Sequence, residues 1–102
     1  MSSVSDRSLH CIASAPLSPA GQRLLAQLEK DDPLLLTGKA VALAAASHPS
    51  ITDWVATGAV IHALEEDLLA HGITDLHPSV ITTDYVGWVS LTENYRTQVL
   101  WR

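Results

Sequence analysis

The sequence predicts a single α/β domain with a three-layer α/β/α arrangement, in which a mostly parallel sheet of about five strands has helices on both faces. Apolar segments of strand length alternate with helix-like segments along the chain, which is typical of parallel strands joined by helical crossovers. In residues 60–72, VIHALEEDLLAHG, a strand-like segment runs into a helix with no glycine or proline between them. The chain has 102 residues, which is enough for one hydrophobic core.

The N-terminal part of the chain begins with a polar segment. We expect residues 1–7 to be a disordered tail and residues 8–102 to form the domain. Leu9–Ser14 has the length and apolar content of a buried strand. Ser18 followed by proline is a helix start signal, and the helix that it begins must end before Pro33.

The next three elements follow from apolar runs bounded by proline and glycine. Residues 33–38, PLLLTG, predict the second strand. Residues 39–47, KAVALAAAS, favour a helix that is nearly all apolar, so it must be covered on more than one side by this domain or by another chain. A short helix around Trp54 is expected to end before Gly58.

Residues 60–72 supply the third strand and the third helix. Three acidic residues, at positions 65–67, occupy the first helical turn, where the helix dipole favours carboxylates. Gly72 is placed to adopt the left-handed conformation that ends many helices.

The last part of the chain predicts one more helix between two strands. Val80–Thr83 is the fourth strand, and Asp84 is suited to cap a helix with Tyr85, Trp88, Val89 and Thr92 along one face. Thr97–Trp101 alternates like a final strand.

Composition excludes several classes of function. The formal net charge is −5 with six Lys and Arg residues, so we expect no direct nucleic-acid binding. No apolar run approaches the roughly 18 residues of a membrane span, and the N-terminal residues lack a secretory signal pattern. A single cysteine cannot form an internal disulfide, so we expect a cytoplasmic protein. The low charged content, 17%, favours a surface partly covered in an oligomer.

The strand-to-helix junctions are where ligands bind in this fold class, and none of them carries a phosphate-binding motif. The Gly38-Lys39 pair resembles a P-loop fragment, but Pro33 stands where that motif has a glycine and Ala40 where it has Ser or Thr. The adjacent carboxylates of residues 65–67 diverge by about 100° each on a helix, so they are read as solvated charges that complement the dipole.

Cys11 is the only candidate nucleophile, and the residue patterns favour a structural role for it. His10 is its neighbour in a strand and points to the opposite face, so it cannot serve as the base. Reactive thiols lie near helix N-termini or cations, whereas Cys11 lies within a strand. The five histidines show no metal-binding spacing, so we expect no metal and no cofactor. The candidate interface residues are the tryptophans, a residue type enriched at interfaces: Trp54, Trp88 and Trp101.

Five segments in order resemble the TusB/DsrH family of sulfur-relay subunits. They cover the chain from Leu9 to Trp101, and none is a catalytic signature by itself. The segments are LHCIASAP (9–16), LLLTGKAVALA (34–44), ALEEDLLAHGI (63–73), VITTDYVGWVSLT (80–92) and QVLW (98–101).

The resemblance implies a flavodoxin-like, DsrEFH-type domain and a place in a protein complex. Proteins of this family associate with TusC/DsrF-like and TusD/DsrE-like subunits in a heterohexamer. That complex receives persulfide sulfur by way of TusA-like proteins and passes it to TusE-like proteins, toward 2-thiolation of the tRNA wobble uridine. The main carrier cysteine belongs to the TusD-like subunit.

DsrH proteins of sulfur oxidisers carry a cysteine of their own in the first helix. Residues 20–27 of this chain contain none, and the matching position is at or near Leu25. Cys11 matches neither carrier site. This departure favours the Tus-like role in tRNA thiolation over the Dsr-like role, and an accessory subunit that does not itself carry sulfur.

Three hypotheses remain open at this point. The first is a structural, interaction subunit of a sulfur-relay complex. The second, from the enzyme class, makes Cys11 a persulfide carrier; the alternative to the tRNA-thiolation role of the first is a DsrH-like subunit in sulfur oxidation. The third is a self-associating module that binds a small ligand in the crevice at the strand ends.

Overall fold

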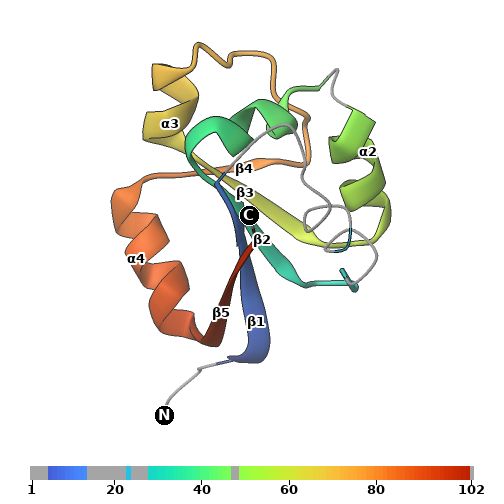
Figure 1. Cartoon of the computed structure of the whole chain (residues 1–102), viewed down its shortest axis with the longest axis vertical. Helices are drawn as coiled ribbons and strands as arrows, with labels where there is room; N and C mark the ends of the chain where they lie inside the picture. Colours follow the sequence, from blue (N-terminus) through green and yellow to red (C-terminus); the bar gives the residue numbers. More distant parts are fainter. Residues whose placement is uncertain (1–4, 14–22, 24–27, 47–48, 102) are drawn as a thin grey trace.

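The fold is an α/β domain built on a five-stranded, all-parallel sheet (Figure 1). The computed structural model describes residues 5–13, 23, 28–46 and 49–101. The elements in chain order are β1 (Ser5–Ile12), β2 (Pro33–Leu36), the 3₁₀ helix η1 (Gly38–Ala44), α2 (Pro49–Ala56), β3 (Val60–Leu64), α3 (Glu65–Ala70), β4 (Ile81–Thr83), α4 (Tyr85–Asn94) and β5 (Tyr95–Trp101). The predicted fold class is therefore confirmed.

The strand order, β4-β3-β2-β1-β5, places the helices on two faces. From β1 to β4 the chain moves across the sheet in one direction, and β5 then returns to the far side of β1. Because parallel crossovers are right-handed, the connections that reverse direction lie on opposite faces. Accordingly α4, which leads from β4 back to β5, lies across the sheet from η1 and α2 (Figure 1).

The main core lies on the η1 and α2 face of the sheet. Side chains of paired residues in a parallel sheet share a face, so Ile12, Leu36 and Ala63 project together from β1, β2 and β3. Trp54 of α2 and Leu68 of α3 pack into the same buried cluster. All four residues of β2 are buried, as expected for a central strand covered on both faces.

The α4 face of the sheet is covered less completely. Leu9, Leu35 and Leu64 are buried outside the main core cluster. The helix α4 itself has no buried residue, although it is ten residues long. Part of this face therefore remains open, and both cavities described below lie there.

The apolar segment 39–47 forms a shorter and tighter helix than predicted. The 3₁₀ helix η1 ends at Ala44, and residues 44–46 then pair with residues 75–77 through the bonds Ala46 N–H to Asp75 O (2.7 Å) and His77 N–H to Ala44 O (3.0 Å). This extended pairing with a distant segment competes with further helix. The expected covering is present, since four η1 residues are at most 1% exposed: Ala40, Val41, Leu43 and Ala44.

The segment 60–72 forms the predicted strand and helix, ended by the predicted glycine cap. Gly72 has a φ of 67°, and its N–H donates to Leu69 O (3.2 Å). The next residue, Ile73, donates its N–H to Leu68 O (2.9 Å). These two bonds form a Schellman motif, which requires the left-handed conformation that glycine adopts without strain.

Other boundaries differ from the sequence prediction by a few residues. β1 begins at Ser5, inside the segment predicted as a tail, because Ser5 pairs with Tyr95 of β5. β5 correspondingly begins two residues before the predicted Thr97.

Residues 18–27 of the predicted first helix lie outside the described part of the chain except for Arg23, which is helical. Residues 28–32 are described and are not helical, so the prediction that the helix extends to Asp31–Asp32 is wrong; Asp31 lies in a turn with a φ of 68°. Among the described segments, no helix has the length and apolar character needed to cross a membrane.

Candidate functional site

Two cavities lie on the α4 face of the sheet, one on each side of α4. The His62 cavity has a volume of about 410 Å³ and is lined by His62, Glu65, Thr82, Thr83, Asp84, Gly87, Ser90, Leu91 and Asn94. The Cys11 cavity has a volume of about 360 Å³ and is lined by Cys11, Leu35, Thr37, Trp88, Gln98, Val99 and Leu100. The first lining is mostly polar, and the second is mostly apolar.

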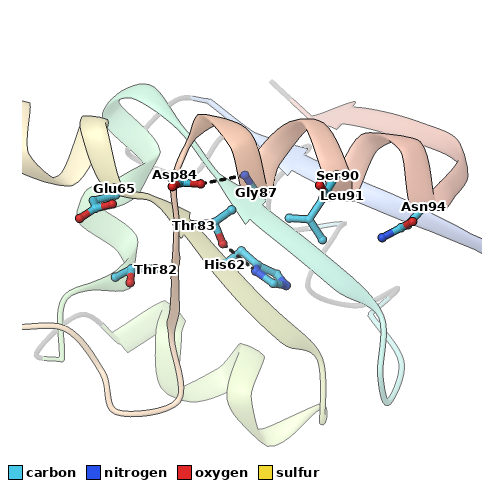
Figure 2. Close-up of a pocket in the computed structure, with 9 residues that line it drawn as sticks. All are labelled: His62, Glu65, Thr82, Thr83, Asp84, Gly87, Ser90, Leu91 and Asn94. Atoms are coloured by element: carbon cyan, nitrogen blue, oxygen red, sulfur yellow. Dashed lines mark hydrogen bonds between the residues drawn. The ribbon is translucent and has the colours of Figure 1, made fainter.

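The His62 cavity is formed where β3, β4 and α4 converge (Figure 2). Its α4 residues are Gly87, Ser90, Leu91 and Asn94, whose spacing of three, four and seven places them on one helical strip. Figure 2 shows the residues from α4 in a row above His62, with Glu65 toward one end and Asn94 at the other, while the side chain of Thr82 lies on the other side of β4. The cavity is therefore elongated along α4.

His62 is the titratable side chain below this row. The alternation of β3 turns Ile61 and Ala63 toward the main core and His62 toward α4. Its Nδ1 lies 2.9 Å from Oγ1 of Thr83, which is itself buried (Figure 2). Burial lowers the pKa of His62 below its usual value, so the ring is neutral at pH 7.

Protonation of His62 is expected to destabilise the protein. Because the pKa is lower in the folded chain than in the unfolded chain, the unfolded state binds more protons as the pH falls below about 6.5, and stability decreases there. We expect the free energy of unfolding to be higher at pH 7 than at pH 5.5, with a smaller difference in His62→Gln. Urea unfolding at both pH values measures this. If the free energy of unfolding changed equally between the two pH values in the unaltered chain and in His62→Gln, the expectation would be contradicted. The control variant is His77→Gln, because His77 lies outside the cavity.

The N-terminus of α4 is held tightly against β4. Asp84 caps the helix as predicted, its Oδ1 accepting the N–H of Gly87 at 2.8 Å. A Cβ atom at Gly87 would lie 2.9 Å from Cγ2 of Thr83, so only glycine permits this approach without a shift. The close contact positions Ser90 and Asn94 over His62.

The three acidic residues of α3 separate, as predicted from their helical spacing, but only Glu65 is exposed, so the prediction of three solvated charges is wrong for Glu66 and Asp67. Glu65 lines the His62 cavity, whereas Asp67 accepts the Gly38 N–H with its Oδ2 at 2.7 Å. Glu66 has a buried Oε1 atom without a hydrogen-bond partner among the described residues. Asp67 thus occupies the backbone N–H that a bound phosphate would need at the Gly38-Lys39 junction. Within the described residues, no three His, Cys, Asp or Glu side chains are placed to hold a metal ion.

Cys11 lines the other cavity and lies in β1, next to Leu35 of β2 and Leu100 of β5. The thiol is partly buried, and burial raises its pKa above the usual value. Because the thiolate is the nucleophilic form, a raised pKa makes Cys11 less reactive at neutral pH. The strand pairing places His10 on the opposite face with Leu34, as the alternation of the strand predicts.

The three tryptophans lie in different surroundings. Trp54 is 0% exposed and belongs to the main core, so an interface role for its ring would require the core to open. Trp88 is half-buried beside the Cys11 cavity, with its ring 5.9 Å from that of Tyr85. Trp101 pairs with Ile12 at the end of β5, and its side chain lies outside the described part of the chain.

The α4 face also carries large exposed apolar side chains. Val86, Val89 and Tyr85 of α4 are 76%, 50% and 50% exposed, and Ile81 of β4 and Leu100 of β5 are 46% and 55% exposed. The sequence prediction placed Tyr85 and Val89 on one face of this helix with Trp88. The described structure instead turns the strip of Gly87, Leu91 and Asn94 toward the sheet.

The His62 cavity was missed by the sequence reasoning, although two patterns indicate parts of it. The alternation of VIHAL separates His62 from the core residues beside it. The strip of residues 87, 90, 91 and 94 has helical spacing. Neither pattern reveals that the two come together, because this depends on which face α4 covers.

Comparison with known proteins gives consistent matches over most of the chain. Residues 14–98 match the family described as DsrH like protein. The chain is 29% identical over 94 residues to Protein TusB of Sodalis glossinidius (strain morsitans), covering 91% of this chain and 99% of that protein. It is 30% identical, with the same coverage, to Protein TusB of Escherichia coli (strain ATCC 8739) and of Shigella boydii serotype 18.

Proposed function

Because the chain belongs to the DsrH-like family of sulfur-relay proteins, we propose that it is an accessory subunit of a TusBCD-like complex. In this proposal the complex passes persulfide sulfur toward 2-thiolation of the tRNA wobble uridine in the cytoplasm. The observation that carries the proposal is the match to proteins named TusB over 99% of their length. A likeness along nearly the whole length of these relatives supports the same kind of role.

The proposed role is interaction and support, with the carrier cysteine on another subunit. Residues 20–27, where DsrH-type carriers have a cysteine, contain none in this chain. Cys11 is partly buried near the carboxyl end of β1, and burial raises the pKa of its thiol. A protonated, partly covered thiol is poorly suited to accept sulfur from an incoming persulfide. These observations support a subunit that does not itself carry sulfur.

The expected partners are TusC/DsrF-like and TusD/DsrE-like subunits in a heterohexamer, with TusA-like and TusE-like proteins as donor and acceptor of sulfur. The exposed apolar side chains of α4, β4 and β5 support association, because burying apolar surface at an interface is favourable. Direct tRNA binding needs Lys and Arg side chains, and this chain has six of them at a net charge of −5.

Co-expression with TusC-like and TusD-like chains from the same genome tests the proposal. We expect a stable hetero-oligomer in size-exclusion chromatography with light scattering, and sulfur transfer to a TusE-like acceptor that depends on the complete complex. Cys11→Ser is expected to retain that transfer. A chain that stays alone beside these partners would refute the proposal.

The alternatives make different predictions in the same assay. If Cys11 carries persulfide, Cys11→Ser abolishes transfer and native Cys11 is labelled by iodoacetamide without denaturant. If the chain instead acts in sulfur oxidation, its complex supplies sulfur to oxidative enzymes. Deletion of its gene then leaves the level of tRNA thiolation unchanged.

A further inference from the structure

We propose that the His62 cavity receives an arginine side chain from a partner subunit, and that this contact orients the partner on the α4 face. The inference rests on the proposed function, since it assigns one surface of this chain to assembly. It is carried by the cavity's charge, its neutral acceptors along α4 and the exposed apolar side chains on its two sides.

The charge of the cavity favours a cation. Two of its lining residues, Glu65 and Asp84, have carboxylates, and the lining contains no lysine or arginine. His62 is the other titratable group of the lining, and its lowered pKa keeps the ring uncharged at neutral pH. The lining therefore offers negative charge and no positive charge, in a chain whose net charge is −5.

The neutral groups of the lining favour a guanidinium over a smaller cation. Ser90 and Asn94 add side-chain oxygens that accept hydrogen bonds, along the α4 side of the cavity in Figure 2. A guanidinium has five N–H donors in a flat fork and suits several acceptors at once, whereas an ammonium acts as a point charge. The elongated cavity of about 410 Å³ has room for one long side chain.

The sides of the cavity favour a protein as the source of that arginine. On the sheet side, Ile81 pairs with His62 on the edge strand β4 and is 46% exposed. On the helix side, Val86 lies one turn before Ser90 on α4 and is 76% exposed. A polar pocket between exposed apolar side chains matches interfaces in which a buried arginine anchor is surrounded by apolar contacts. A free small cation would leave Ile81 and Val86 exposed.

The chemistry of the cavity is tested on the isolated chain by NMR titration with N-acetyl-L-arginine amide. We expect saturable shifts of the amides of Thr83, Ser90 and Asn94, weaker shifts with N-acetyl-L-lysine amide, and none with N-acetyl-L-norleucine amide. Glu65→Gln should weaken arginine-probe binding by about two- to fivefold, because its partly exposed carboxylate forms a screened ion pair. Glu93→Gln is the matched control, since Glu93 lies on α4 outside the lining. No saturable shift, or equal weakening by both variants, would overturn the assignment.

The role in assembly is tested with charge-reversed chains in the co-expressed complex. Glu65→Arg should reduce recovery of the partner about tenfold, because it places a cation where the partner's arginine binds, while Glu93→Arg should not. Circular dichroism verifies that the variants fold, and Ser90→Trp, which fills the cavity without changing charge, serves if Glu65→Arg does not. Full assembly of these variants would overturn the inference and leave the proposed function intact. If the unaltered chain fails to assemble, the proposed function fails, and the probe titration alone decides the cavity.

Discussion

Trp54→Ala is expected to lower the free energy of unfolding by about 3–5 kcal/mol, the largest effect that we expect from a single substitution in this chain. The indole of Trp54 is 0% exposed and packs in the main core with Leu36, Ile51 and Ile61. Alanine would leave a cavity that the parallel sheet beneath cannot fill by moving. Domains of this size have a free energy of unfolding of roughly 5–15 kcal/mol, so this loss is a large fraction of the total stability.

Trp54→Phe is the matched variant, and we expect a much smaller loss. The indole Nε1 is buried without a hydrogen-bond acceptor among the described residues, so replacing the indole by phenyl removes an unsatisfied donor. Urea unfolding followed by circular dichroism measures both variants. Similar losses for alanine and phenylalanine would show that Trp54 Nε1 forms a bond that matters to stability.

Leu35→Ala is expected to cost about 2–5 kcal/mol and to make Cys11 accessible. Leu35 is 0% exposed on the α4 face and pairs with Cys11 in the neighbouring strand, where both line the same cavity. Removing its isobutyl group enlarges that cavity beside the thiol. We expect faster alkylation of Cys11 by iodoacetamide under native conditions, measured by mass spectrometry.

Leu100→Ala separates the effect of burial from that of position. Leu100 lines the same cavity and pairs with Cys11 from the other side, but it is 55% exposed. Its truncation should therefore cost well under half of the Leu35→Ala loss, because much of its surface already contacts water. Equal losses for the two variants would contradict the full burial of Leu35.

The comparison of Leu35 with Leu100 shows which neighbours limit the access of solvent to the Cys11 thiol. Cys11 is covered by a central strand on one side and by an edge strand on the other, with Trp88 of α4 above. If a partner covers the α4 face, as we propose, Cys11 becomes still less accessible in the complex. Cys11 would then not react with the persulfide carried by another subunit of the complex.

Most of the sheet could be predicted from sequence because its signals are local. The leucines of β2, the strand-to-helix transition at Leu64–Glu65 and the Gly72 cap each depend on residues adjacent in the chain. The end of η1 at Ala44 and the start of β1 at Ser5 could not be predicted in this way. Each is decided by backbone pairing with a distant segment, residues 75–77 in the first case and Tyr95 in the second.

The sequence by itself determined the α/β class, the helix caps at Asp84 and Gly72, and the family, since all of these depend on the order and spacing of residues. Only the tertiary structure decided that α4 crosses to the face opposite α2, because β5 returns to the far side of β1. That reversal brings Ser90 and Asn94 over His62 and leaves Val86 exposed. The His62 cavity exists because of strand order, and strand order is set by packing between residues far apart in the chain.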